Sequence, residues 1–315
     1  MINMKTHTVV SKQKKKFNKN QRQLLLIALP FVAFVFIFSY IPLFGWSYAF
    51  FDYHPGVSLI DSTFAGLKYF RMALDFKGGS ELLLVLRNTL VLSFLSLALS
   101  PLPVIFAIFL SEMNSKFFKK FIQTTTTLPN FISWILVYAI CIATFSINDG
   151  FLNDILLKLN FIKSPMNPLA NGDIAWYFQT GLGVWKGLGF GSIIYLAAIG
   201  GIDSEQYDAA SVDGAGRFSK IRHITIPGVL PTYFVLLLLA VSNILSNGFD
   251  QYYAFMNAMV QPNLQVFDYY VYRVGIGLNQ YSLSTALGIF KSVVSITLLF
   301  TVNKMAKKVR GESII

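Results

Sequence analysis

Six long runs of residues, each with at most one charged side chain, constrain the fold more than any other feature of the sequence. The first covers residues 23–51, and a transmembrane helix needs roughly 20 mostly apolar residues. Only 13% of the whole chain is charged, whereas about 25% is usual in a soluble domain. This composition excludes an ordinary soluble enzyme, and it excludes a disordered chain, which needs low hydrophobicity. The sequence therefore predicts an all-α membrane protein with six transmembrane helices, the other five in residues 88–111, 121–148, 174–202, 224–249 and 274–303.

The basic residues predict which side of the membrane each loop faces. If the N-terminus is cytoplasmic, the inner segments hold 17 Lys and Arg residues and the outer segments hold 7, as the positive-inside rule requires. We therefore expect both termini in the cytoplasm. The predicted segments are a basic N-terminal segment 1–22, a first transmembrane helix 23–51, an extracellular loop 52–86, a five-helix core 87–305 that contains a cytoplasmic loop 203–227, and a cytoplasmic tail 306–315.

The sequence lacks the motifs of several kinds of catalytic site. It has no Walker A glycine loop, no HExxH or GxSxG motif, and a single cysteine, Cys141. We therefore expect no enzymatic activity, no metal site and no disulfide within the chain. The net charge of +11 comes largely from tracts beside apolar runs, such as residues 12–19. Such tracts contact anionic membrane lipid, and we expect no nucleic acid partner.

The predicted cytoplasmic loop 203–227 carries the most specific pattern. Asp203 or Ser204 is placed to cap the start of a short helix, and Gly214 fits its end. Residues at helical spacing between them form one mostly small face. Such a face permits close approach of a partner's surface, or packing of the loop on its own helices, and the spacing does not decide between the two. The face consists of Tyr207, Ala210, Ser211 and Gly214.

This loop resembles the EAA loop of the permease subunits of ATP-binding-cassette (ABC) importers. The family pattern is EAA, three residues, Gly, nine residues and Ile-x-Leu-Pro, and the loop matches its spacing throughout. Asp208 replaces Glu and Ile226 replaces Leu. In the family the loop docks into a groove of the ATPase subunit. The resemblance therefore implies an ATPase-coupling role for Glu205, Tyr207, Asp208, Ala209, Ala210, Asp213, Gly214, Arg217, Ile224 and Pro227.

The resemblance extends over about residues 85–305 and is strongest toward permeases that import complex oligosaccharides, relatives of the maltose-transporter permeases. It rests on residues 185–189, 193–198, 268–273 and 288–294. It implies a type I importer fold in the plasma membrane of a bacterium, with transport by alternating access. The implied partners are a second homologous permease, two ATPase subunits that bind ATP and Mg, and an extracellular solute-binding protein that delivers the oligosaccharide. The chain itself is expected to bind no cofactor.

Polar side chains within the apolar runs are candidates for the substrate pathway. Residues 243, 246, 247 and 250 lie at helical spacing in the half of the fifth helix nearest the outside and form a polar stripe, which either lines a pathway or bonds helices together. An intramembrane lysine costs about 2.5–3.5 kcal/mol, so it must find a structural partner or a substrate. Aromatic faces suit sugar rings. The candidates are Trp185, Lys186, Asn243, Ser246, Asn247, Asp250, Tyr253 and Lys291.

Two other functions fit a multi-span chain. An ion-gradient-driven secondary transporter of a small polar solute would use the intramembrane lysines for ion coupling. Its mark would be an inverted internal repeat with broken helices; no clear repeat is visible, and the loop 203–227 would be unexplained. A membrane scaffold without transport would not need the polar stripe.

Overall fold

The computed structural model describes residues 19–75 and 81–310, so most of the basic segment 1–22 and the end of the tail 306–315 lie outside the described residues. The chain divides into two compact units, residues 1–48 and 49–315, which are described separately. In the first unit, α1 (Lys19–Val35) continues through a π-helical turn (Phe36–Tyr40) into a 3-10 helix (Ile41–Phe50), whose last two residues belong to the second unit. Residues 23–44 of this continuous helix are exposed and mostly apolar, which is typical of a membrane-spanning helix.

The second unit begins with a small hairpin. Strands β1 (Phe51–Asp52) and β2 (Thr63–Phe64) pair antiparallel, with Phe51 opposite Phe64. The Tyr69 hydroxyl donates a hydrogen bond to the Asp52 carboxylate and holds the pKa of that carboxyl below its ordinary value. Ser282 Oγ donates to the Phe51 carbonyl at 2.7 Å, so side-chain bonding ties the hairpin to the helix that contains Ser282.

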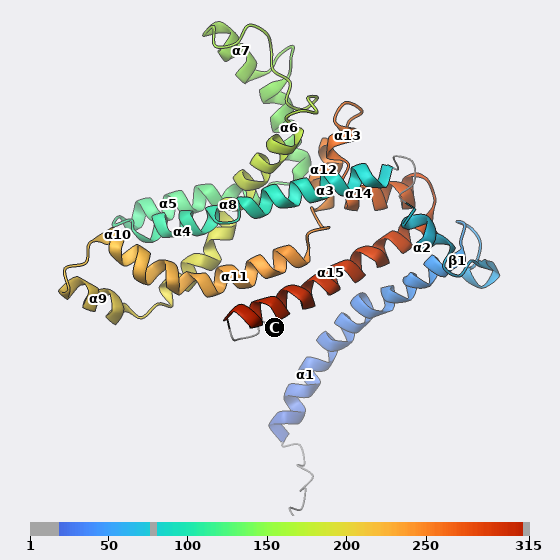
Figure 1. Cartoon of the computed structure of the whole chain (residues 1–315), viewed down its shortest axis with the longest axis horizontal. Helices are drawn as coiled ribbons and strands as arrows, with labels where there is room; N and C mark the ends of the chain where they lie inside the picture. The colour runs from blue at the N-terminus through green and yellow to red at the C-terminus, as the bar shows by residue number, and fades with distance from the viewer. Residues whose placement is uncertain (1–18, 76–80, 311–315) are drawn as a thin grey trace, which may run out of the picture. The chain divides into compact units, whose positions relative to one another are not determined.

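The rest of the second unit is helical (Figure 1). Short helices and turns connect the long ones, and three of the starts are capped by Ser115, Ser133 and Asp203, whose side chains accept a backbone N–H. The α-helices are α2 (Lys68–Ala73), α3 (Glu81–Ala98), α4 (Leu102–Ser111), α5 (Lys116–Thr127), α6 (Trp134–Phe145), α7 (Phe151–Lys158), α8 (Ala175–Gly200), α9 (Ser204–Val212), α10 (Arg217–Lys220), α11 (Ile226–Ser242), α12 (Phe249–Phe255), α13 (Gln261–Leu264), α14 (Phe267–Tyr272) and α15 (Tyr281–Arg310). The 3-10 turns are Leu59–Asp61 and Leu128–Phe131, and the π-helical turns are Ile221–Thr225 and Arg273–Gly277.

Five helices among the described residues are long and apolar enough to cross a membrane: Gln23–Phe50, Glu81–Ser111, Ala175–Gly200, Arg217–Ser242 and Tyr281–Lys308. A sixth candidate is the pair Lys116–Phe131 and Trp134–Phe145, which is bent by 102° at its break. The chain therefore has the predicted six candidate spans when the bent pair counts as one.

The fifth span differs from its predicted bounds of 224–249. It begins earlier, at Arg217, because the π-helical turn Ile221–Thr225 carries the helix without interruption up to Pro227. Pro227 therefore lies within this span. The span also ends earlier, at Ser242. The predicted start is too late because it lies after the last basic residue. Basic residues are tolerated at the end of a span, where their charge remains in water.

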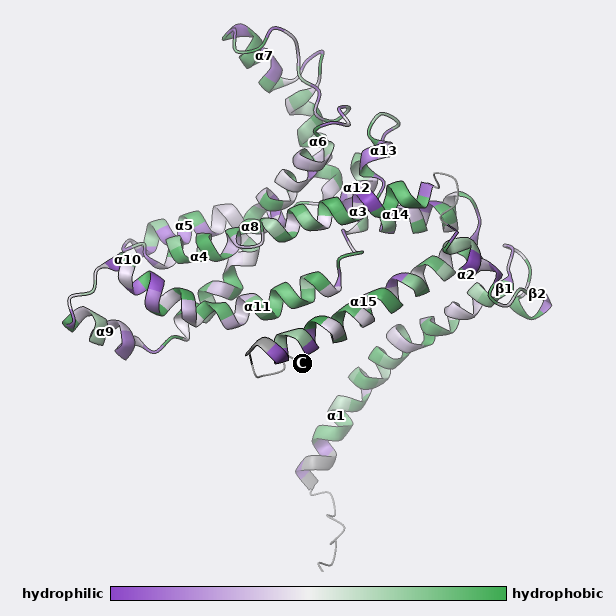
Figure 2. Cartoon of the chain, viewed as in Figure 1, coloured by the Kyte–Doolittle hydropathy of each residue, from purple (hydrophilic) through white to green (hydrophobic). Residues whose placement is uncertain are grey.

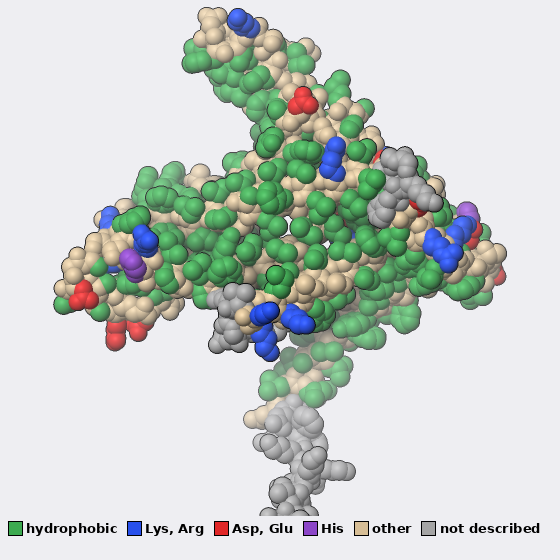
Figure 3. All heavy atoms as spheres, viewed as in Figure 1, with side chains coloured by type: hydrophobic (Ala, Val, Ile, Leu, Met, Phe, Trp, Pro, Cys, Tyr) green, Lys and Arg blue, Asp and Glu red, His purple; other side chains and the backbone are tan. Residues whose placement is uncertain are grey.

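Apolar side chains cover the long helices, and charged side chains lie mainly toward their ends (Figures 2 and 3). The helices of the second unit pack through four small apolar clusters. One joins α3 to the α12–α14 region through Leu92, Tyr252 and Val266, and another joins α4, α8 and α11 through Ala107, Tyr195 and Val229. These contacts place polar segments of α3, α8 and α12 beside one another.

Candidate functional site

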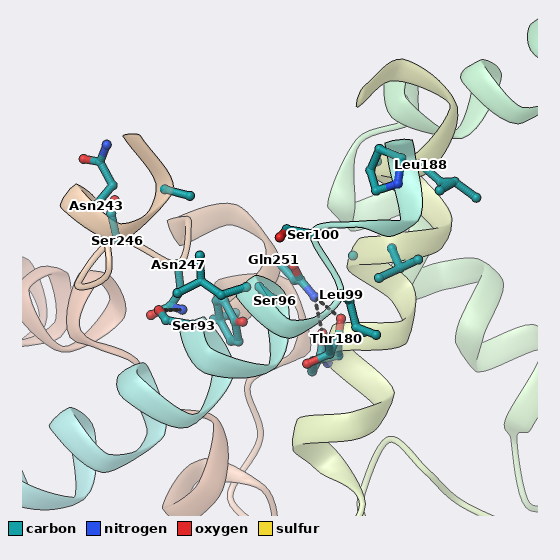
Figure 4. A pocket seen from close by; sticks show the side chains of 18 residues that line it. Ser93, Ser96, Leu99, Ser100, Thr180, Leu188, Asn243, Ser246, Asn247 and Gln251 are labelled. Atoms are coloured by element: carbon teal, nitrogen blue, oxygen red, sulfur yellow. Dashed lines mark hydrogen bonds between the residues drawn. The ribbon is translucent and has the colours of Figure 1, made fainter. Parts of the chain in front are cut away.

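A hollow of about 430 Å³ lies among α3, α8, the end of α11 and α12. Figure 4 shows Ser93, Ser96 and Ser100 following the α3 wall, with Thr180 and Leu188 on α8 across from it. Its volume is within the usual range for a ligand site. The lining residues are Ser93, Ser96, Leu97, Leu99, Ser100, Pro103, Gln179, Thr180, Gly183, Val184, Gly187, Leu188, Ala240, Asn243, Ser246, Asn247, Gln251 and Tyr252.

Small residues keep this hollow open. Gly183 and Gly187 lie one helical turn apart on α8, and a Cβ built on either would meet no other atom within 4 Å. The walls are joined to each other beside the open space. Gln251 Nε2 on α12 donates to the Gln179 carbonyl at 2.9 Å and to Gln179 Oε1 at 2.8 Å. Hydrogen bonds between α8 and α12 therefore hold the walls of the hollow in place.

Three of the eight predicted pathway residues line the hollow: Asn243, Ser246 and Asn247. The other five lie outside its lining. Trp185 and Tyr253 are 45% and 49% exposed, and Tyr253 stacks on Phe249 with ring centroids 5.0 Å apart. Asp250 is exposed in the first turn of α12. Lys186 and Lys291 bind partners within the chain.

The predicted helical stripe through residues 243–250 does not exist, because α11 ends at Ser242. Asn247 Nδ2 donates to Ser93 Oγ at 2.8 Å, and Ser93 Oγ donates to the Ile244 carbonyl at 2.6 Å. Gly248 adopts a φ of +87°, and its N–H donates to Asp268 Oδ2 at 3.3 Å. A break at membrane depth requires such replacement partners for its backbone groups. Bonds to α3 and α14 thus replace the helical ladder that the sequence pattern suggested.

Lys186 has structural partners. Its side chain is 9% exposed, and Nζ donates to the carbonyls of Asn130 at 2.7 Å and Pro129 at 3.3 Å. These carbonyls lie at the 102° break between Leu128–Phe131 and α6. Gly189, one turn further along α8, lets the helices approach: a Cβ there would lie 2.3 Å from the Thr126 carbonyl oxygen. Lys186 therefore stabilises the break in the third span.

Lys291 on α15 forms an ion pair with Asp268 of α14. Its Nζ also donates to Ser246 Oγ at 3.1 Å. The same carboxylate accepts the N–H of Gly248. The pair therefore anchors the segment after α11, and the positive charge is compensated within the chain.

The prediction missed most of the hollow's polar lining, namely Ser93, Ser96, Ser100, Gln179, Thr180, Gln251 and Tyr252. The three serines follow one face of the second apolar run at spacings of three and four, a helical signal that was available in the sequence. The glutamines carry no such pattern, because they come together only when α8 and α12 meet.

The helix α9 in the loop 203–227 is defined by its own ends. Asp203 caps it, since Oδ1 accepts the Glu205 N–H at 3.0 Å, as predicted. Gly214 ends it with a φ of +74°. The N–H groups of Ala215 and Gly214 donate to the carbonyls of Ala210 (2.8 Å) and Ser211 (3.1 Å), which is the Schellman arrangement.

The two faces of α9 have different surroundings. On the predicted small face, the Tyr207 hydroxyl bonds to Thr225 Oγ1 at 2.9 Å, and Lys220 Nζ donates to Ser211 Oγ at 2.6 Å. That face therefore turns partly toward the chain's own helices. The exposed residues of α9 include Glu205, Asp208, Ala209 and Val212, the last 87% exposed.

Arg217 connects this loop to another part of the chain. Its guanidinium donates to Asn114 Oδ1 at 3.0 Å and lies 3.6 Å from the Glu112 carboxylate. The turn between α4 and α5 and the start of the fifth span are thus joined. Asp213 and Pro227 are exposed, and Ile224 is half-buried.

Residues 99–311 match the family described as the binding-protein-dependent transport system inner membrane component. The chain belongs to this family. The permease is 37% identical to protein LplB of Bacillus subtilis over 94% of this chain and 92% of that one. It is 36% identical to the polygalacturonan/rhamnogalacturonan transport system permease protein YteP of the same organism, over 93% and 90% of the two chains.

A solved bacterial ABC transporter involved in import of the acidic polysaccharide alginate has the same fold. A chain of it superposes with a TM-score of 0.81 at 30% identity, over 93% of the permease and 97% of that chain. The predicted fold class, a type I ABC importer permease, is confirmed. The permease is a multi-pass membrane protein and not an enzyme, because ATP hydrolysis in such importers resides in separate subunits. Within the described residues no group of His, Cys, Asp or Glu side chains is arranged to hold a metal ion.

Proposed function

We propose that the permease is one of two homologous subunits that form the path for an oligosaccharide across a bacterial plasma membrane. An extracellular solute-binding protein delivers the sugar, and two cytoplasmic ATPase subunits drive transport with ATP and Mg. Support comes from relatives named for oligosaccharide or polysaccharide transport. A related alginate importer has been solved together with a periplasmic protein that carries a pentasaccharide.

The observation that carries the proposal is the open hollow between the spans. Hydroxyl and amide groups from three separate elements line it, and they suit the hydroxyls of a sugar. Of the predicted pathway residues we retain Asn243, Ser246 and Asn247. Lys186 and Lys291 have structural roles in this proposal.

The exposed surface of α9 is the proposed ATPase contact. Glu205, Asp208, Ala209 and Val212 present a short face with acidic and apolar groups. Tyr207 bonds this helix to Thr225 in the fifth span, and Arg217, at the start of that span, bonds it to the α4–α5 turn. A displacement of α9 by the ATPase is therefore transmitted to the spans.

The secondary transporter fits less well. Its appeal was two intramembrane lysines available to couple an ion, and both are already bonded within the chain. The match to an importer family that works with a binding protein also opposes an ion-driven mechanism.

Filling the hollow tests the proposed path. Gly183→Leu adds a side chain to the open space, so uptake of labelled oligosaccharide by the assembled importer should fall at least about tenfold, while co-purification of the ATPase persists. Gly181→Leu is the matched control, since Gly181 is on the same helix, has no atom within 4 Å of an added Cβ and does not line the hollow. Normal uptake by Gly183→Leu would mean that the path lies elsewhere.

We also propose that both termini are cytoplasmic. Ser164→Cys, in the exposed loop after α7, should react with an impermeant thiol reagent in intact cells, and Ser204→Cys should not. The native Cys141 is buried and provides a silent background. Labelling at 204 from outside would reverse the topology.

A further inference from the structure

The lining of the hollow carries no ionisable Lys, Arg, Asp, Glu or His side chain among the described residues. Its polar groups are hydroxyls and carboxamides, which donate and accept hydrogen bonds without net charge. The hydroxyl groups belong to Ser93, Ser96, Ser100, Thr180, Ser246 and Tyr252, and the carboxamides to Gln179, Asn243, Asn247 and Gln251.

The lysines on the neighbouring helices do not supply a positive charge to this wall. Lys186 donates to the carbonyls of Pro129 and Asn130, and it is nearly buried there. Lys291 is compensated by Asp268. A carboxylate that enters the hollow would lose part of its hydration and would find no cation of this chain to replace it. Burying an unpaired charge is costly.

Asn247 adds an independent observation. Its Nδ2 is used by Ser93 Oγ and the Thr89 carbonyl. This fixes the orientation of the amide and leaves Oδ1 as an acceptor, buried without a hydrogen-bond partner among the described residues. Because Oδ1 itself is buried, a sugar in the hollow does not reach it. Its partial negative charge lies in this wall without a compensating donor, which adds to the cost of placing a carboxylate beside it.

We propose that this permease's wall of the pathway is selective for uncharged oligosaccharides and disfavours chains of uronic acids. The inference rests on the proposed function. The fold does not determine the charge of the cargo, because the alginate importer has the same fold and is involved in import of an acidic polysaccharide. The lining residues of this chain therefore set the preference, through hydroxyl and amide groups that match the hydroxyls of a neutral sugar.

A pair of opposite charges at one lining position tests this directly. Ser96 is exposed on the α3 wall of the hollow. The variants are Ser96→Lys, Ser96→Asp and the uncharged control Ser96→Asn, each in the complete importer in proteoliposomes. The probes are a set of labelled neutral gluco- and manno-tetrasaccharides and labelled tetragalacturonate. Size-exclusion profiles and ATPase co-purification verify that each variant assembles.

The wild-type importer should take up a neutral tetrasaccharide and not tetragalacturonate. Both charged variants should lower that uptake to a similar degree, about tenfold, because either charge needs hydration that the passing sugar displaces. Ser96→Asn keeps an uncharged hydrogen-bonding side chain and measures the effect of added size alone, so its loss of uptake should be clearly smaller than that of either charged variant. The proposed selectivity would be overturned if the wild-type importer takes up tetragalacturonate, Ser96→Lys keeps this uptake and Ser96→Asp loses it. The importer function itself would then stand. If the wild type takes up no oligosaccharide and the loaded binding protein does not stimulate ATP hydrolysis, the proposed function itself fails.

Discussion

Two segments that end helices in this permease are stabilised in opposite ways. The α9 turn, residues 212–216, is held by bonds among neighbours in sequence: Gly214 and Ala215 donate to carbonyls of the helix they end. The α11–α12 break, residues 243–248, keeps a turn bond of its own, from the Ser246 N–H to the Asn243 carbonyl at 2.8 Å, and is also held by residues far away in sequence. Asn247 bonds to Ser93 on α3, and Gly248 bonds to Asp268 on α14.

This difference reflects the surroundings of the two segments. The α9 turn is largely exposed, so water can satisfy any group that the chain does not. The α11–α12 break lies beside the hollow, between the fifth and sixth spans, and its bonds to Ser93 and Asp268 join it to two other helices of the core. We therefore expect damage to the break to affect the whole permease, and damage to the turn to affect only its partner surface.

The largest effect is expected from breaking the ion pair at the break. Lys291→Met leaves the Asp268 carboxylate, 16% exposed, without its cation. Removing one partner of a fully buried pair costs about 3–5 kcal/mol, and this partly buried pair should cost less, so the thermal unfolding temperature of the purified permease should still fall clearly and uptake should be lost. The double variant Lys291→Met/Asp268→Asn removes both charges and should recover part of the stability.

Lys158→Met is the control, since Lys158 lies exposed at the end of α7. It should unfold at the wild-type temperature. If Lys291→Met also unfolds at that temperature, the pair is not what holds the break, and the contrast with the α9 turn loses its basis.

The same contrast explains how far the sequence could predict the structure. The sequence narrows the start of α9 to a cap at Asp203 or Ser204 and places its end at Gly214, because a cap and a left-handed glycine act within a few residues; the structure selects Asp203. The polar stripe at 243–250 was read as helix, and its true conformation depends on Ser93 and Asp268, which no local pattern relates to it.

The six candidate spans were equally accessible from the sequence, because hydrophobic length is a local property. The partners of Lys186 and Lys291 were not. An intramembrane lysine needs a partner, but the sequence does not show which one. Lys186 binds backbone carbonyls because α8 packs against the Leu128–Phe131 turn, and Lys291 binds a carboxylate because α15 packs against α14.

A smaller and more local effect is expected at the α9 turn. Gly214→Val places a β-branched side chain at a φ of +74°, which costs about 1–3 kcal/mol. Thermal unfolding of the permease should change little, while retention of the ATPase during purification should fall about 5- to 100-fold. Substrate-stimulated ATP hydrolysis should decline in parallel.

Gly216→Val is a matched control. Gly216 is two residues away, has an ordinary φ of −70°, and has no atom within 4 Å of an added Cβ. It should retain the ATPase nearly as well as wild type. If Gly214→Val and Gly216→Val lose ATPase retention equally, then added bulk on this surface explains the loss and the backbone conformation of Gly214 does not.

The smallest effect should come from the cap at the other end of α9. Asp203→Ala removes the oxygen that accepts the Glu205 N–H, and loss of an N-cap typically costs about 1 kcal/mol. Because Asp203 is exposed, water compensates in part and the spans should stay intact. We expect faster amide exchange confined to α9 and a reduction in ATPase retention of about fivefold or less. Asp203→Asn keeps an acceptor oxygen at the same position and should behave as wild type. If the exchange instead quickens along α11 as well, then α9 supports the fifth span through Tyr207 and Thr225, and the turn is less independent of the core than its own hydrogen bonds indicate.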